Sequence, residues 1–107
     1  MLIRRKVIIK GVAPGGSIRK NIARLAAELK VNGWVRNCHY CSVEACFEGS
    51  RSEVDALVIL CFVGPGRGVV DEIIVERRSY QGTLRGFRIM TDAESSCTGM
   101  AAYKMAV

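Results

Sequence analysis

The stretch Gly11-Val12-Ala13-Pro14-Gly15-Gly16-Ser17-Ile18-Arg19 lies between an apolar, β-branched run at residues 7–9 and a segment with helical periodicity. It predicts a strand, a glycine-rich loop and the start of a helix with an arginine in its first turn. Amide groups at a helix N-terminus have no partners within the helix and carry partial positive charge. With an arginine guanidinium beside them they can bind a phosphate group, although many such glycine loops are only tight turns.

The segments around this loop predict a strand followed by an amphipathic helix. Residues 3–10 have the β-branched pattern of a first strand. In the helix that follows the loop, Ser17 is the expected N-cap and Asn32-Gly33 the expected end. The apolar residues of this helix fall on one face and are expected in the core: Ile18, Ile22, Leu25, Ala26 and Leu29.

The middle of the chain predicts a hairpin and a second helix. Residues 34–39 and 42–48 predict two strands joined by residues 40–41. The capping-box spacing of Ser50-Arg51-Ser52-Glu53 indicates a helix start, and the glycines and proline at 64–66 indicate its end. The core-facing stripe of this helix comprises Val54, Leu57, Val58, Cys61 and Phe62. Three further apolar residues indicate either a deeply covered helix or an association surface: Ile59, Leu60 and Val63.

The remaining residues complete one domain and a tail. Residues 69–77 predict a fourth strand, 79–82 a turn and 87–90 a short fifth strand. The pattern fades from residue 91 onward, so the domain is expected to span 1–90 and the tail, 91–107, to be loosely ordered. The order βαββαβ with an extra C-terminal strand predicts a ferredoxin-like α+β sandwich, in which two helices cover one face of a mainly antiparallel sheet.

Composition limits the class of protein and its partners. The 107 residues fit one domain, and the net charge of +6, from 16 Lys and Arg against 10 Asp and Glu, suits anionic partners. The five cysteines are odd in number and no secretion signal is evident, which indicates a reducing, cytoplasmic setting with free thiols. The longest uncharged apolar run, residues 56–63, is too short to span a bilayer, so no membrane partner is expected.

Two motifs in the chain resemble those of the acylphosphatase family. That family opens with a strand and Gly-x-Val-Gln-Gly-Val-x-Phe-Arg, and Gly11, Gly15 and Arg19 stand at the corresponding places here. The family's second motif, Gly-Trp-Val-x-Asn, matches residues 33–37, which read Gly33-Trp34-Val35-Arg36-Asn37. The resemblance extends over roughly residues 5–90, and Val43 and Gly49 also stand at the family's spacing.

The resemblance implies hydrolysis of the carboxyl–phosphate bond of acyl phosphates, with inorganic phosphate as a product and with neither metal nor cofactor. It implies that Arg19 binds the phosphoryl group and that Asn37 positions the attacking water through its side-chain amide. The chain is expected to act as a monomer, although the broad apolar face of its second helix allows dimerisation. The resemblance also implies that backbone amides of the loop bind phosphate, namely those of Gly15, Gly16, Ser17, Ile18 and Arg19. Because an acyl phosphate has a good leaving group, holding the phosphoryl group and orienting a water are the main requirements.

Departures from the family's first motif leave alternative functions open. Pro14 replaces a glutamine and has no N–H to donate, and Gly16 replaces a valine and loosens the loop. A domain of this fold that binds anions or partners without turnover is therefore an alternative. RNA binding is another, because the RNA-recognition fold has the same βαββαβ order, but the third strand has only Phe47 where paired aromatics would stack bases.

The cysteines and the tryptophan have plain structural interpretations beside functional ones. Residues 38–41, Cys38-His39-Tyr40-Cys41, resemble half of a zinc site, but the chain has one histidine and no second pair at a suitable spacing, so no metal is expected. A redox pair at this hairpin stays open. Trp34, Cys46 and Cys61 are expected in the core.

A basic cluster near the C-terminal end of the domain completes the candidate residues. A solvated face is its plain interpretation, and binding of a polyanion is the alternative. Its members are Arg77, Arg78, Arg85 and Arg88.

Overall fold

The computed structural model describes residues 1–11, 16–38, 42–63, 70, 72–90 and 102–105. Within these residues the element order is β1 (Leu2–Lys10), α1 (Gly16–Glu28), β2 (Asn32–Cys38), β3 (Ser42–Ser50), α2 (Arg51–Val63), β4 (Glu72–Arg78), β5 (Phe87–Ile89) and β6 (Ala102–Met105). The predicted βαββαβ order with an extra strand is present, and β6 extends it.

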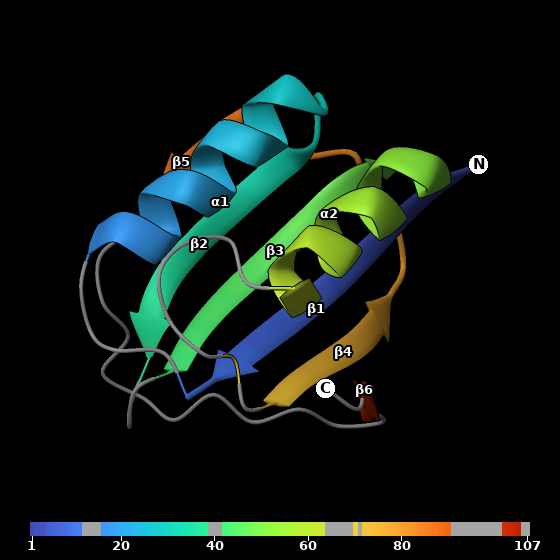
Figure 1. The fold of residues 1–107 in the computed structure, drawn as a ribbon. Helices are drawn as coiled ribbons and strands as arrows, with labels where there is room; N and C mark the ends of the chain where they lie inside the picture. The colour runs from blue at the N-terminus through green and yellow to red at the C-terminus, as the bar shows by residue number, and fades with distance from the viewer. Residues whose placement is uncertain (12–15, 39–41, 64–69, 71, 91–101, 106–107) are drawn as a thin grey trace.

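The strands form one mixed sheet in the order β5-β2-β3-β1-β4-β6. The four central strands are antiparallel to one another where they pair, β5 runs parallel to β2, and β6 runs antiparallel to β4. Both helices lie side by side on one face of this sheet (Figure 1). The sheet and its two helices confirm the predicted ferredoxin-like α+β sandwich.

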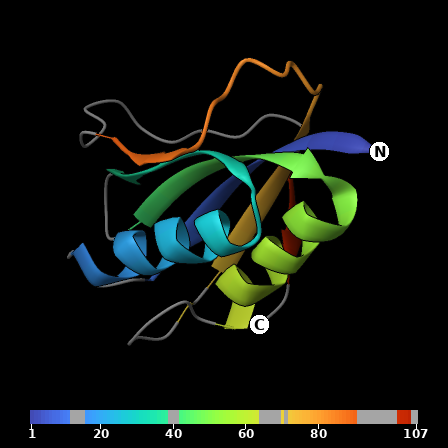
Figure 2. The same cartoon turned by 90° about the horizontal axis from the view of Figure 1, so that it is seen from above.

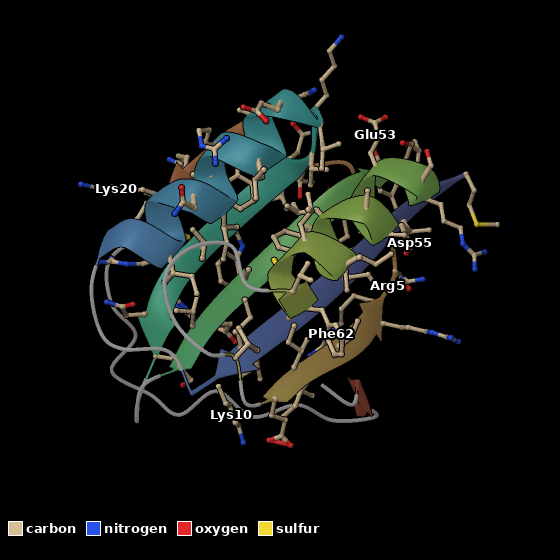
Figure 3. All side chains as sticks on the ribbon, in the orientation of Figure 1. Arg5, Lys10, Lys20, Glu53, Asp55 and Phe62 are labelled. Carbon is tan, nitrogen blue, oxygen red and sulfur yellow. The ribbon has the colours of Figure 1, made fainter. Side chains whose placement is uncertain are left out.

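The core lies between the helices and the sheet. Ile18, Ile22 and Ala26 of α1 are buried, as the helical periodicity predicts. The α2 stripe is buried in the same way, and Phe62 lies between α2 and the sheet, whereas Lys20 on α1 points away from it (Figure 3). The three residues that widen the α2 stripe are exposed, so α2 is not covered on both sides: Ile59, Leu60 and Val63.

The prediction that Trp34 lies in the core is wrong. Its strand neighbours Gly33 and Val35 are buried, and Val35 belongs to the core cluster, while Trp34 is partly exposed. Successive residues of a strand point to opposite faces, so Val35 and Trp34 cannot both face the helices. Trp34 therefore lies on the helix-free face of the sheet, opposite Cys46 of β3.

The ends of α1 differ from those predicted. The helix starts at Gly16, so Ser17 lies in its first turn rather than at the N-cap position. It ends at Glu28 rather than at Asn32-Gly33, because Lys30 adopts a left-handed conformation with φ of 59°. The Val31 amide donates to the Ala26 carbonyl at 2.8 Å and the Lys30 amide to the Ala27 carbonyl at 3.2 Å, which is the Schellman pattern.

The start of α2 confirms the predicted capping box. Ser50 immediately precedes the helix, and its hydroxyl donates to the Glu53 carboxylate at 2.6 Å. Glu53 also places a negative charge in the first turn, where the helix dipole favours it.

Within the predicted tail, residues 102–105 form β6, which pairs with β4 from Ile73 to Glu76. Without β6, β4 would be an edge strand with unpaired backbone groups on its outer side, so the pairing has a physical reason. Neither helix in the described part of the chain is long and apolar enough to cross a membrane.

Candidate active site

One end of the sheet brings together the residues singled out by the motif analysis. β1 ends at Lys10, β2 ends at Cys38 and β3 begins at Ser42, and the registers pair Ser42 with both Lys10 and Cys38. α1 begins at this same end of the sheet (Figure 1). The first turn of α1 and the last residues of β2 therefore lie at the same end of the sheet, although most of α1 and most of β2 separate them in sequence.

Arg19 lies in the first turn of α1, as predicted. The neighbouring Ile18 is 5% exposed and fixes the first turn to the core, while the Arg19 side chain is partly buried with its Nε atom inside. The first turn contains no acidic residue. The partial positive charge of the helix start is therefore not neutralised by a carboxylate of its own turn.

Asn37 lies near the end of β2 on the side of the sheet that the helices cover. It is opposite Val43 of β3 in the register, and Val43 belongs to the core between helices and sheet. Two residues earlier, Val35 points to the same core, as strand alternation requires. The partly buried Asn37 side chain is thus on the same side of the sheet as α1 and Arg19.

The other predicted phosphate-binding residues are placed only in part. Gly16, Ser17 and Ile18 form the first residues of α1, so their backbone amides belong to the helix N-terminus. Gly15 lies outside the described residues.

Gly33 explains why the second motif begins with glycine. Its φ is +148°, and a Cβ at this position would lie 1.8 Å from the Cys46 carbonyl oxygen. No side chain fits there unless β2 moves away from β3. Gly33 thus permits the close pairing that carries Val35 and Asn37 to their places.

The described cysteines differ in state from the expectation of free thiols throughout. Cys38 is disulfide-bonded, so that expectation is wrong for this residue, whereas Cys46 and Cys61 are free and buried as predicted. Burial raises the pKa of the Cys61 thiol to about 12. Burial also raises the pKa of the Cys46 thiol, although the nearby Arg4 guanidinium opposes that shift. His39 and Cys41 of the half zinc motif lie outside the described residues.

A group of charged residues on the helix-free face occupies no defining position of the two sequence motifs. Lys6 and Arg36 flank Glu44, with Lys6 Nζ 2.8 Å from Oε2 and Arg36 Nη2 2.5 Å from Oε1. Arg4 Nη1 lies 3.5 Å from Glu48 Oε2. The available signal was a charge at every second or fourth position of a strand: Arg4 and Lys6 in β1, Arg36 two residues after Trp34 in β2, and Glu44 and Glu48 in β3.

The fold and the site together define a class of protein. The chain is a ferredoxin-like α+β domain in which an arginine in the first helical turn and an asparagine at a strand end share one end of the sheet. The family model for acylphosphatases matches residues 5–89. The chain therefore belongs to the acylphosphatase family.

Individual relatives agree with this assignment. The acylphosphatase of Geobacter sulfurreducens is 43% identical over 89 residues, which are 83% of this chain and 98% of the relative. That of Syntrophus aciditrophicus is 38% identical over 96 residues, covering 90% of this chain and all of the relative. The crystal structure of the Bacillus subtilis acylphosphatase superposes with a TM-score of 0.76 at 26% identity, over 84% of this chain and 99% of that one.

Proposed function

We propose that the chain hydrolyses acyl phosphates to a carboxylate and inorganic phosphate, with Arg19 and the α1 amides binding the phosphoryl group and Asn37 positioning the water. Family membership supports the activity, and the shared position of Arg19 and Asn37 at one end of the sheet supports their roles. That shared position is the observation on which the residue assignment depends.

The chemistry needs few protein groups. Water attacks the phosphorus, the bond between phosphorus and the carboxyl oxygen breaks, and the carboxylate leaves with the bonding electron pair. Arg19 stays charged at every accessible pH and offers a planar fork of donors to the phosphoryl oxygens. The Asn37 amide orients the water without itself changing protonation state. Water then gives its proton to solvent or to the phosphate product.

The test is hydrolysis of benzoyl phosphate in the presence of a chelator. Removing one donor to a developing oxyanion costs about 10²–10³ in rate, so Arg19→Ala and Asn37→Ala are each expected to lower kcat/KM by about that factor. Arg19→Ala should also raise KM, because it removes a charge that holds the substrate. Arg19→Lys, which keeps the charge but not the fork, should recover only part of the loss.

Arg24→Ala is the matched control. Arg24 lies on α1 with an exposed side chain and pairs with Glu28 at 3.1 Å, so this variant removes an arginine from the same helix without touching the site. Its kcat/KM should stay within about two-fold of the unmodified chain. Full activity in both Arg19→Ala and Asn37→Ala would reject the assignment of the site, and absence of hydrolysis from the folded chain would reject the activity.

We also propose that the protein is a cytoplasmic monomer and that its activity needs no metal ion. A small domain with its own core needs no partner to fold, and the proposed chemistry assigns every role to Arg19, Asn37 and backbone amides. Sedimentation equilibrium tests the oligomeric state, and the chelator in the assay above tests the metal. A dimer mass, or loss of activity with chelator, would contradict these two statements.

A further inference from the structure

The helix-free face of the sheet carries a pocket that the proposed hydrolysis does not use. It has a volume of about 580 Å³ and lies over β1, β2 and β3, beside the end of β4. The connection from β4 to β5, residues 79–86, passes on this side of the sheet, away from the helices (Figure 2). The residues that line the pocket include Arg4, Lys6, Trp34, Arg36, Arg78 and Gln81.

The connection is fixed at the rim of this pocket by a buried carboxylate. Glu48 is 1% exposed, and its Oε2 accepts hydrogen bonds from the backbone amides of Gln81 at 2.8 Å and Gly82 at 3.4 Å. Arg4 lies 3.5 Å from the same oxygen. The rim is therefore tied to β1 and β3 and keeps its shape without a ligand.

Charges in the pocket are layered, with anions beneath cations. The side chains of Glu44 and Glu48 are each 1% exposed, whereas those of Arg4, Lys6 and Arg36 are 17%, 23% and 30% exposed. The same order holds at β4, where the Glu76 side chain is 3% exposed and its ion-pair partner Arg78 is 45% exposed. A molecule entering the pocket thus meets cations and not the carboxylates that neutralise part of their charge.

Four cations on the helix-free face line the pocket, and three buried carboxylates pair with them. The cations are Arg4, Lys6, Arg36 and Arg78, and the carboxylates are Glu44, Glu48 and Glu76. Because two of the cations share Glu44 and all four are more exposed than the carboxylates, the pocket favours an anionic ligand. Arginine suits phosphate in particular, because its donor fork matches two phosphate oxygens.

One wall of the pocket is aromatic. The Arg36 guanidinium lies 5.0 Å from the centre of the Trp34 ring, within cation–π range. Trp34 also lines a second, smaller pocket together with Arg85 and Arg88, so both pockets beside the ring contain arginines. Indole and guanidinium surfaces both stack on flat, conjugated rings.

We propose that this pocket binds a nucleoside diphosphate, with its phosphates against the exposed cations and its base against Trp34 and Arg36. The volume falls within the range of small-molecule sites, about 300–1,000 Å³. The pocket lies on the face of the sheet opposite α1, so the ligand and an acyl phosphate substrate bind on separate faces. The strand places Arg36 toward the pocket and its neighbour Asn37 toward the helices.

The chain offers a direct probe of this site, because Trp34 is its only tryptophan. Titration of the intact protein with ADP should change Trp34 fluorescence, and calorimetry should give one site. Arg36→Met should weaken ADP binding about ten-fold or more, since it removes a charged donor while Lys6 still pairs with Glu44 at 2.8 Å. Arg78→Met, at the exposed rim, should also weaken binding.

Matched variants and ligands make the experiment decisive. Arg24→Met removes the same charge from the outer face of α1 and should leave ADP affinity unchanged, as should Arg19→Ala, which removes the charge of the proposed active site on the opposite face of the sheet. Adenosine and tripolyphosphate should each bind at least about ten-fold more weakly than ADP, because each lacks half of the contacts.

Four results would overturn the proposal. The first is that a folded sample does not bind ADP, and the second is that Arg36→Met and Arg78→Met both bind ADP as tightly as the unmodified chain does. The third is that the unmodified chain binds tripolyphosphate as tightly as ADP, and the fourth is that it binds a single-stranded oligonucleotide but not ADP. The last would instead make this face a nucleic-acid surface.

Discussion

Gly33 shows how one residue sets the geometry of the proposed site. A Cβ there would lie 1.8 Å from the Cys46 carbonyl oxygen, and the backbone φ of +148° disfavours any side chain. Gly33→Ala should therefore lower the free energy of unfolding by about 3 kcal/mol or more, since both strain and strand separation oppose it. Urea unfolding measures this loss. Hydrolysis by any folded fraction should fall as well, because Asn37 lies on the same strand.

Gly86→Ala is the control for this prediction. Gly86 has a φ of +67°, but no heavy atom lies within 4 Å of the position that a Cβ would take. The variant should lose only the cost of a left-handed alanine, about 1 kcal/mol. Equal losses in the two variants would contradict the close-approach explanation for Gly33.

Cys61 should make the stability of the protein fall at alkaline pH. Burial raises the pKa of its thiol from 9.0 to about 12, so between these values the unfolded chain releases a proton that the folded chain keeps. The contribution of this thiol is complete below pH 9.0 and is lost as pH rises toward 12. Linkage gives a decrease of about 1.4 kcal/mol per pH unit at its steepest.

Urea unfolding at about pH 8 and about pH 10 measures this effect against Cys61→Ala. The unmodified chain should lose about 1 kcal/mol more than the variant between the two conditions. Cys46 titrates in the same direction in both proteins, so its contribution cancels in the comparison. Parallel pH dependences would show that burial of Cys61 does not hold its proton.

At the scale of the element, the end of α1 depends on Lys30, a residue that disfavours the left-handed conformation which this position requires. Lys30 adopts φ of 59° to complete the Schellman pattern, although left-handed geometry costs a residue with a Cβ about 1–2 kcal/mol. Lys30→Gly should raise the free energy of unfolding by about 0.5–1 kcal/mol, after the extra freedom of the unfolded glycine is subtracted. Thermal or urea unfolding measures the gain.

The matched control places the same substitution inside the helix. Lys20 lies in α1 with an exposed side chain that points away from the sheet (Figure 3). Lys20→Gly should lower the free energy of unfolding by about 1 kcal/mol, the usual cost of glycine in a helix interior. The two lysines are thus predicted to respond with opposite signs, and equal signs would contradict the role given to Lys30.

Patterns in the sequence predict the elements better than their ends. Apolar periodicity places Ile22 and Leu57 in the core because period 3.6 leaves one helical face to bury. Asn32-Gly33 is wrongly predicted as a helix end because the same glycine that could end a helix serves the close pairing of β2 with β3. Trp34 is wrongly predicted in the core because hydrophobicity alone does not say which face of a strand is covered; its neighbour Val35 occupies the core.

The candidate site is predictable from the sequence because its elements follow one another along the chain. A strand, loop and helix in succession place Arg19 at a sheet end, and the hairpin of β2 and β3 returns Asn37 to it. The pocket on the other face is not predictable in this way, because Arg4, Arg36 and Arg78 come from three strands that only the register brings together. Charges that alternate along a strand usually indicate contact with solvent. Glu44 and Glu48 are nevertheless buried, because the assembled sheet places cations from neighbouring strands over them.

At the scale of the whole molecule, the tail adds to a domain that already has the family's elements. The family match ends at residue 89, and the Geobacter sulfurreducens relative is covered over 98% of its length by 83% of this chain. β6 lies beyond that match and pairs with β4, which would otherwise be at the edge of the sheet. The fold and the proposed site therefore do not require β6, whereas the protection of β4 does.

Truncation after residue 100 separates these two roles. The shortened chain should still fold and hydrolyse benzoyl phosphate at an unchanged kcat/KM, because Arg19 and Asn37 lie at the other end of the sheet order, on α1 and β2. It should unfold at a lower urea concentration and associate at high protein concentration, because β4 then presents unpaired N–H and C=O groups along Ile73 to Glu76. Sedimentation velocity and urea unfolding measure both effects. A truncated chain with unchanged stability and no association would show that β6 does not protect β4, and a truncated chain that fails to fold would show that the family's elements alone do not suffice here.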